Sequence, residues 1–387
     1  MLLFARLWRH LPELAGLAAV IWVQYQFSRR FLKFESVRSS PGLQRWIRVL
    51  TVVASVWVSC GVIATFPALY RALPGSALVY WIRGSALAWC FASAGAYVMF
   101  ELWRRVPKFR SERRGFIRAA GAAFVAAPFA VVAFGIIVQR KDFRLREVRV
   151  PITNLPKDLD GLRIAQLSDI HLSPFLSERE LARAVAMANE VRPHLAVVTG
   201  DLISSPGDPL DACLFQLTKL KADAGTLGCL GNHEIYARVE DEATRKAARL
   251  GIPMLRQQSR VLRFGNASLN VAGVDYQKMH GNYLQGAQRM IVPGATNLLL
   301  SHNPDVFDVA AGQGRDLTLD GHTHGGQVTV EILNQTINAA RFFTPYIYGL
   351  YQQGLSSIWV TRGIGTVGLP ARLGAPPEVV LIRLCAT

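Results

Sequence analysis

The sequence predicts two parts: about four membrane-spanning helices, followed by an α/β domain. Three observations predict this. Long apolar runs crowd into the first 140 residues. From residue 162 onward, short apolar runs alternate with amphipathic stretches, which is the pattern of strands joined by crossover helices. Several of these short runs end at polar motifs that contain histidine, aspartate or asparagine. We therefore divide the chain into a transmembrane region, residues 1–140, and a second domain, residues 141–387.

Four runs in the first part are apolar enough to span a bilayer, which takes about 20 helical residues. They cover residues 11–27, 47–69, 76–102 and 116–138. Four such runs in succession, flanked by arginines, favour membrane helices over buried core helices. The first part therefore predicts a multi-pass membrane protein.

The connecting segments predict the orientation of these helices. The first and third connections are rich in lysine and arginine, whereas the second contains only Arg71. Basic loops remain in the cytoplasm, so both termini should lie outside it, in the periplasm of a bacterial inner membrane. One basic cluster argues against this orientation, because it follows the last apolar run. Its members are Arg140, Lys141, Arg144, Arg146 and Arg149.

Residues 111–118, with the sequence Ser-Glu-Arg-Arg-Gly-Phe-Ile-Arg, resemble a twin-arginine export signal placed before an apolar helix. The alternative is an ordinary membrane helix with a basic flank. Both interpretations place residue 141 and the following chain across the membrane.

The distribution of charge counts against a nucleic-acid partner. The formal net charge is +16, but residues 1–150 contain 22 Lys/Arg and 6 Asp/Glu, whereas residues 151–387 contain 21 of each. A nucleic-acid-binding protein carries its basic patch on the folded domain, and this domain is neutral. We therefore expect a lipid bilayer and no nucleic acid as a partner. Cysteine is sparse, and for Cys213 and Cys229 we favour buried free thiols over a disulfide.

The second part begins with alternating strands and helices. We predict strands over residues 162–167, 195–199 and 226–230, and helices over residues 178–190, 209–220 and 240–250. This alternation predicts a largely parallel sheet covered by helices. Later strands follow without long helices, and their spacing suggests a second, mixed sheet. They cover residues 268–274, 297–301, 317–319, 327–330, 358–361 and 379–384.

Five of the eight histidines lie in polar motifs that follow the predicted strands. The motifs are Asp169-Ile170-His171, Gly200-Asp201, Gly231-Asn232-His233-Glu234, Ser301-His302 and Gly321-His322-Thr323-His324. Loops at the carboxyl ends of strands can converge on one point. Aspartate, neutral histidine and asparagine are ligands for divalent cations, and two such ions about 4 Å apart can activate water and neutralise phosphoryl oxygens.

Each motif residue alone is more often a helix cap, a turn residue or an ordinary loop histidine. The prediction of a metal site therefore depends on the motifs occurring together. Three of them contain a glycine directly before a proposed ligand, and we expect these glycines to let the backbone turn sharply.

These motifs, in this order, resemble those of the calcineurin-like metallophosphoesterases over residues 145–385. The resemblance implies a four-layer sandwich of two mixed β-sheets flanked by helices, and two divalent metal ions such as Mn, Fe or Zn. It implies that Asp201 bridges the two metals and that His233 protonates the leaving group after attack by a metal-bridging hydroxide. The other implied ligands are Asp169, His171 and His324 for the first metal and Asn232, His302 and His322 for the second.

Two positions depart from the family pattern. Family members often have aspartate three residues after the bridging one, where this chain has Ser204. They commonly read Gly-Asn-His-Asp, where this chain has Glu234. Both positions support ligands rather than bind metal, and losing such support costs about 10–100-fold in metal affinity or activity.

Within the family, the chain resembles membrane-anchored bacterial phosphodiesterases and UDP-2,3-diacylglucosamine pyrophosphatases of lipid A synthesis. The cues are residues 167–172 and the Gly-rich tail, residues 362–372. Arg362 and Arg372 in this tail are candidates for gripping a phosphate, as planar guanidinium groups do. The alternative for both is a surface salt bridge.

We expect a two-metal-dependent phosphoesterase that hydrolyses a phosphate ester of a phosphorylated small molecule or lipid head group at the bilayer. One alternative is a UDP-2,3-diacylglucosamine diphosphatase, which needs a cytoplasmic catalytic domain. Another is a catalytically dead membrane sensor or scaffold, which the complete set of seven ligands disfavours.

Overall fold

The computed structural model describes residues 11–65, 72–106, 114–278, 281–332 and 335–387. Residues 107–113 are not described, so the arginine pair of the twin-arginine-like motif lies partly outside the described residues. The chain divides into two compact units, one of Met1–Ile137 with Gly368–Pro370 and one of Val138–Val367 with Ala371–Thr387.

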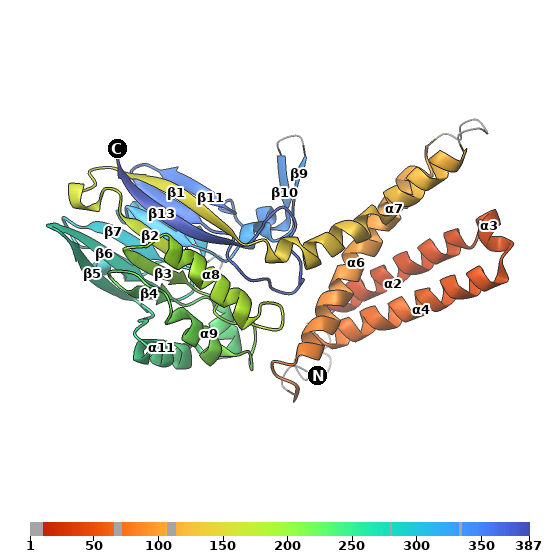
Figure 1. The fold of residues 1–387 in the computed structure, drawn as a ribbon, viewed down its shortest axis with the longest axis horizontal. Coiled ribbons are helices and arrows are strands. Elements are labelled where there is room, and N and C mark those ends of the chain that lie inside the picture. The colour runs from red at the N-terminus through yellow and green to blue at the C-terminus, as the bar shows by residue number, and fades with distance from the viewer. Residues whose placement is uncertain (1–10, 66–71, 107–113, 279–280, 333–334) are drawn as a thin grey trace. The chain divides into compact units, whose positions relative to one another are not determined.

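Each of the four apolar runs of the first unit contains a helix (Figure 1): α2 Leu11–Phe31, α4 Pro41–Ile63, α6 Ala77–Trp103 and α7 Arg114–Ile137, with the short α3 Glu35–Arg38 between the first two. Residues 66–69 of the second run lie outside the described residues. Within the part of the chain that the structure describes, three segments are long and apolar enough to cross a membrane, namely Pro41–Ile63, Ala77–Trp103 and Ala119–Lys141. These helices leave large apolar side chains exposed, as at Trp46 and Leu78. Such surfaces suit contact with lipid.

An ion pair and an aromatic cluster join α2 to α6 inside this unit. Arg30 of α2 forms an ion pair with Glu101 of α6. Phe100 of α6 stacks on Phe31 and meets the edge of Phe27, with ring centroids 5.5 and 5.4 Å apart. Helix α2 therefore packs on its neighbour through a charged pair as well as through apolar contacts.

The second unit contains a first, five-stranded sheet in the order β1-β13-β2-β3-β4. Strands β2, β3 and β4 are mutually parallel, β13 is antiparallel to β2, and β1 is parallel to β13. The bounds are β1 Arg144–Ile152, β2 Arg163–Leu167, β3 Leu195–Thr199, β4 Thr226–Cys229 and β13 Glu378–Ala386. The last strand of the chain thus lies inside this sheet, whereas the sequence placed residues 379–384 in the second sheet.

The second sheet has six strands in the order β11-β12-β8-β7-β6-β5. Its four central strands are parallel, and the edge strands β5 and β11 are antiparallel to their neighbours, so the predicted mixed sheet is confirmed. The bounds are β5 Gln258–Phe264, β6 Ala267–Gly273, β7 Thr296–Leu300, β8 Leu317–Asp320, β11 Gly349–Gln353 and β12 Ser356–Val360.

One predicted strand of this sheet lies elsewhere. Residues 327–330 contribute to β9, Thr329–Ile332, which pairs only with β10, Gln335–Asn338, among the described strands. This hairpin stands out from the two sheets in Figure 1. The apolar run there is too short to separate a hairpin from a core strand by pattern alone.

The apolar side chains form the layers of a sandwich. One core cluster lies between the sheets and combines Ile164 and Val197 of the first sheet with Val271 and Leu298 of the second. A second cluster joins the other face of the first sheet to helices α8, α9 and α11 (Figure 1). These helices are Glu178–Glu190, Leu210–Leu217 and Glu240–Arg249. Two smaller clusters join the outer face of the second sheet to the short helix α12, Phe307–Gly312. The fold is the four-layer α/β sandwich that the sequence predicts.

The layers bring the polar motifs to one edge. Strands β2, β3 and β4 of the first sheet end just before Asp169, Asp201 and Asn232. Strands β7 and β8 of the second sheet end just before His302 and His322. Because each motif follows the carboxyl end of its strand, ligands from both sheets can meet at the same edge.

Candidate metal centre

Three groups of potential metal ligands lie at this edge. They are Asp169 with His171 and His324, His171 with Asp201 and His233, and Asp201 with His302 and His322. Within each group one ligand atom per residue lies within 4.8 Å of the others. The structure therefore brings together the carboxylates and histidines that the sequence singled out, from positions up to 155 residues apart.

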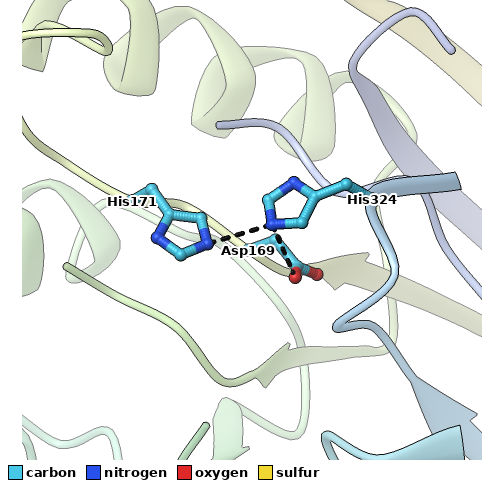
Figure 2. A group of neighbouring side chains, drawn as sticks. All are labelled: Asp169, His171 and His324. Carbon is cyan, nitrogen blue, oxygen red and sulfur yellow. Dashed lines mark hydrogen bonds and ion pairs between the residues drawn. The ribbon is translucent and has the colours of Figure 1, made fainter. Parts of the chain in front are cut away.

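The side chains of the first group lie close together (Figure 2). His171 Nε2 and His324 Nε2 are 3.1 Å apart, and His324 Nε2 lies 3.4 Å from Asp169 Oδ1. Ligand atoms on one tetrahedral cation with bonds of about 2.1 Å are separated by about 3.4 Å. The spacing of the three side chains therefore suits a single divalent ion.

Asp201 lies between the first and the last group. Its Oδ2 atom is 3.4 Å from His171 Nε2 and 3.0 Å from His302 Nε2. Its Oδ1 atom accepts the backbone N–H of His233 at 2.9 Å. One carboxylate thus faces histidines of both groups, which is the arrangement that a bridging ligand requires.

Two buried side-chain atoms at the other end of the site can donate a lone pair to a cation. Once His302 is neutral, its Nε2 atom has a lone pair, because Nδ1 donates to the Thr199 carbonyl at 2.6 Å. Asn232 Oδ1 is buried without a hydrogen-bond partner. Leaving a buried acceptor unpaired costs about 1–3 kcal/mol. A divalent cation would satisfy both atoms, so the donor set fits a metal.

Burial keeps most of the site histidines neutral. Desolvation lowers the pKa of His171 to about 3 and that of His322 to about 4, and it lowers the pKa of His324 further. Burial alone would also lower the pKa of His302, but Asp201 and Asp169 outweigh it and raise this pKa to about 10. Neutral imidazole is the form that binds metal. The two buried carboxylates meanwhile attract positive charge to the centre.

We predict that metal binding displaces a proton. His302 is protonated at neutral pH because its pKa is raised, and a metal ion must replace that proton to reach Nε2. Apparent metal affinity should therefore rise by about tenfold per pH unit between pH 6 and 8. Titration of Mn²⁺ into weakly buffered protein with a pH indicator measures the proton release. An affinity independent of pH would contradict the assignment of His302.

The ligand loops store backbone strain. Five of the seven predicted ligands have positive φ values: 49° at Asp169, 49° at His171, 54° at Asp201, 73° at His322 and 53° at His324. Non-glycine residues rarely adopt this conformation, which costs about 1–3 kcal/mol each where the surroundings impose it. Such strain concentrates at functional sites, and here the rest of the fold holds each side chain toward the centre.

The three motif glycines serve two different purposes. Gly200 has a φ of +84°, as a sharp turn requires. Gly231, with φ −101°, and Gly321 do not adopt a positive φ, so their backbone conformation does not by itself require glycine. A Cβ atom would lie 2.1 Å from Asp201 Oδ1 at Gly231 and 2.1 Å from Ser168 Oγ at Gly321. These two glycines instead permit close approach between ligand loops.

Glu234 connects two of the ligand loops. Its fully buried carboxylate accepts backbone N–H groups of Leu202 at 2.7 Å, Gly231 at 2.8 Å and Asp201 at 3.1 Å. It also caps helix α10, Asn232–Ala237, which the sequence did not predict. The longer glutamate side chain at this position therefore fixes the loops that carry Asp201 and Asn232.

Ser204 orients two histidines. Its Oγ atom lies 3.1 Å from His171 Nδ1, and its carbonyl oxygen lies 2.6 Å from His233 Nδ1. At this position, where family members often have aspartate, the hydroxyl gives His171 an uncharged hydrogen-bond partner.

Removal of this hydroxyl should weaken the site. We expect Ser204→Ala to lower metal affinity or turnover about 10–100-fold, because His171 loses its orienting partner. The neighbouring Ser205→Ala, which keeps every contact to His171, serves as the control. Equal Mn²⁺ affinity and turnover in the two variants would refute this role.

The two predicted phosphate-binding arginines differ in environment. Arg372 is fully buried, and its guanidinium donates to the carbonyl oxygens of Gly365, Ala375 and Arg362 at 2.9, 3.0 and 2.9 Å. Its Nη2 atom also lies 3.3 Å from His324 Nδ1. Arg372 therefore makes its hydrogen bonds inside the protein and has no exposed surface that a substrate could contact. Arg362 is only partly buried and lines a cavity.

Two residues near the centre were missed by sequence reasoning. Asp320 is fully buried directly before Gly321, and desolvation raises its pKa to about 7. The ring of Tyr276 lies 5.5 Å from that of His322 and 6.3 Å from that of His302. Both residues follow or end an apolar strand, which is the signal that could have revealed them.

Comparison with known proteins agrees with this geometry. Residues 162–336 match the family model described as calcineurin-like phosphoesterase. The chain is 31% identical to the uncharacterized metallophosphoesterase YkuE of Bacillus subtilis, over 60% of this chain and 82% of that protein. It is 29% identical to a transmembrane protein with metallophosphoesterase domain of Danio rerio, over 76% and 72% of the two chains. It is also 29% identical to the phosphodiesterase YaeI of Escherichia coli, over 70% and 98%. The chain belongs to the calcineurin-like metallophosphoesterase family.

Proposed function

We propose that this protein is a membrane-bound phosphodiesterase that uses two divalent cations. The position of the Asp201 carboxylate between His171 and His302 is the observation that carries the proposal. We assign Asp169, His171 and His324 to one cation, and Asn232, His302 and His322 to the other. Asp201 serves both.

The bound cations would supply Lewis acidity that activates water and neutralises charge on the phosphoryl oxygens. The chain itself contributes a rigid, dry arrangement of ligands. Asp169, His171, Asp201 and His302 are each at most 1% exposed, so their positions are held by packing as well as by hydrogen bonds. A rigid site pays little reorganisation energy when charge develops on the substrate.

His233 is the residue that we assign to proton transfer. Its Nδ1 atom lies 2.6 Å from the Ser204 carbonyl and donates to it, so Nε2 is the atom that can carry or release a proton. Its ring lies 4.7 Å from that of His171, and the side chain is only partly buried. A partly exposed histidine beside the metal ligands can reach the leaving oxygen of a substrate and protonate it.

We expect His233→Ala to lower kcat by about 100-fold to 10,000-fold, the usual contribution of a general acid. Metal content should stay at the wild-type level, because His233 is outside the seven assigned ligands. The assay is hydrolysis of bis-p-nitrophenyl phosphate by Mn²⁺-loaded full-length protein, with metal content measured in parallel. His194→Gln, which alters a histidine outside the motifs, is the control. Loss of metal in His233→Ala would make His233 a ligand, and full turnover would remove it from the mechanism.

The protein associates with membranes, as its three apolar helices and its transmembrane relatives indicate. We propose a multi-pass protein of a bacterial inner membrane with the catalytic domain on the periplasmic side. Two arginines of the basic cluster that argued against this orientation make contacts within the catalytic domain. Arg144 pairs with Asp142 at 2.7 Å, and Arg146 lies over the rings of Tyr348 and Trp359.

Orientation separates two substrate classes. A periplasmic domain acts on phosphodiesters of membrane-associated molecules, whereas a UDP-2,3-diacylglucosamine diphosphatase needs its domain in the cytoplasm. Alkaline phosphatase and green fluorescent protein fused after Thr387 report the two compartments. We expect an active phosphatase fusion and a dark fluorescent fusion, and the reverse result would overturn the periplasmic assignment.

A further inference from the structure

A cavity of about 610 Å³ lies beside the metal centre in the second unit. Gly325, which directly follows the predicted ligand His324, forms part of its wall. The remaining wall includes Asn338, Arg341, Tyr348 and Arg362. Its volume is in the range of small-molecule sites, which is about 300–1,000 Å³. The cavity can therefore hold a part of a substrate that extends away from the metals.

The described lining is positively charged. It contains two arginines, Arg341 and Arg362, and no aspartate or glutamate. Among the described residues, neither guanidinium has a carboxylate oxygen within 4.0 Å. Arginine side chains have a planar fork of donors that matches phosphate and carboxylate groups. The charge of the lining therefore favours an anionic ligand.

Arg362 is held in place before any ligand arrives. Its guanidinium carbon lies 3.8 Å from the centroid of the Tyr348 ring. The Tyr348 hydroxyl in turn donates to Glu378 Oε2 at 3.3 Å. The Arg362 stem lies against Gly325, where a Cβ atom would come within 2.7 Å of Arg362 Cγ. Because the side chain is already ordered by stacking, binding costs less conformational entropy.

Asn338 adds an unused donor to the same cavity. Its side chain is 6% exposed, and its Nδ2 atom is buried without a hydrogen-bond partner. Its Oδ1 atom accepts the backbone N–H of Arg341 at 3.2 Å, so the amide is oriented with the donor free. Leaving a buried donor unpaired is unfavourable, and an anionic oxygen that reaches this Nδ2 atom would remove the cost.

We propose that this cavity binds a second anionic group of the substrate, a phosphate or carboxylate. The substrate class is then a phosphoester that carries one anionic group at the metals and another between Arg341 and Arg362. This assignment rests on the proposed function, because it treats the cavity as the neighbour of a phosphoester site. The second group can belong to a lipid head group or to a soluble molecule.

The direct test measures anion binding with the metals removed. Full-length protein in phosphatidylcholine nanodiscs is stripped of metal and titrated with inorganic pyrophosphate by calorimetry. We expect saturable binding that Arg362→Gln and Arg341→Gln each weaken by about tenfold or more, the usual effect of losing a hydrogen bond to a charged group. Arg341 is exposed, so its variant should fold normally. Arg260→Gln, at an exposed site on β5, is the matched control and should bind as the wild type does.

Wild-type binding no tighter than that of the two variants would overturn the proposal.

A second arm distinguishes the sources of the anion. Phosphatidylinositol 4-phosphate in the nanodisc should weaken pyrophosphate binding if the ligand is a lipid head group. Soluble inositol 1,4-bisphosphate should weaken pyrophosphate binding if the ligand is a soluble molecule. Competition by neither would also contradict an anion site for substrates. Hydrolysis of bis-p-nitrophenyl phosphate is measured separately, so loss of the proposed function and loss of the cavity's role give different results.

Discussion

Asp201→Asn should abolish almost all phosphodiesterase activity, by about 1,000-fold or more, since both cations depend on this carboxylate. The substitution keeps the size of the side chain and its acceptor for the His233 N–H, but it removes the negative charge between His171 and His302. Metal content should fall with activity. Turnover of bis-p-nitrophenyl phosphate and elemental analysis of the same sample measure the two effects.

The matched control for this variant is Asp223→Asn, at an exposed position outside the ligand motifs. It should retain wild-type turnover and metal content. If Asp201→Asn also retained both, Asp201 would not be a ligand and the two-cation account would be wrong. If it kept its metals but lost turnover, the carboxylate would act on the substrate and not as a bridge.

Arg372→Met should cause the largest loss of stability among the predictions. The buried guanidinium satisfies carbonyl oxygens of Arg362, Gly365 and Ala375, and methionine leaves them unpaired. We expect the free energy of unfolding to fall by about 3 kcal/mol or more. For a domain of this size that loss corresponds to a decrease in Tm of about 6–12 °C. Thermal unfolding of the full-length protein measures the change.

The contact with the metal ligand gives this variant a second readout. Arg372 Nη2 lies 3.3 Å from His324 Nδ1, so the variant should also bind Mn²⁺ more weakly. Arg372→Lys keeps a positive charge and some donors, and it should recover part of the stability. An unchanged Tm in Arg372→Met would show that the carbonyl oxygens find other partners, and wild-type Mn²⁺ affinity would show that Arg372 does not position His324.

The sequence predicted the helices and strands that are marked by a helix cap or by a short run of apolar residues. Helix α8 begins after Ser177, whose hydroxyl caps the helix together with Glu180, and its bounds agree with the sequence prediction. The buried strands β2 and β3 also agree to within one residue, because short runs of mostly apolar residues mark them. The edge strand β5 was not predicted, since its side chains are mostly exposed and its polar residues resemble those of a loop.

The sequence did not show which sheet each strand joins or which distant residues contact one another. Strand β13 is buried on both of its faces, a pattern that fits either sheet. Its pairing with β1 and β2 is what assigns it to the first sheet. The ligand motifs were recognised because they form an ordered series. The sequence placed Ser204 in a supporting role but did not show which histidines it contacts, since His171 and His233 lie 33 and 29 positions away. It did not predict the structural role of Arg372, which contacts His324 from 48 positions away.

The metal content of the purified protein tests the central claim most directly. Full-length protein is stripped with a chelator, reloaded separately with Mn²⁺, Fe²⁺ or Zn²⁺, freed of excess ion and subjected to elemental analysis. The seven assigned ligands predict about two equivalents of at least one metal per chain, with Asp201 shared by the two ions. Folded protein that retains no divalent ion under any of these conditions would contradict the account.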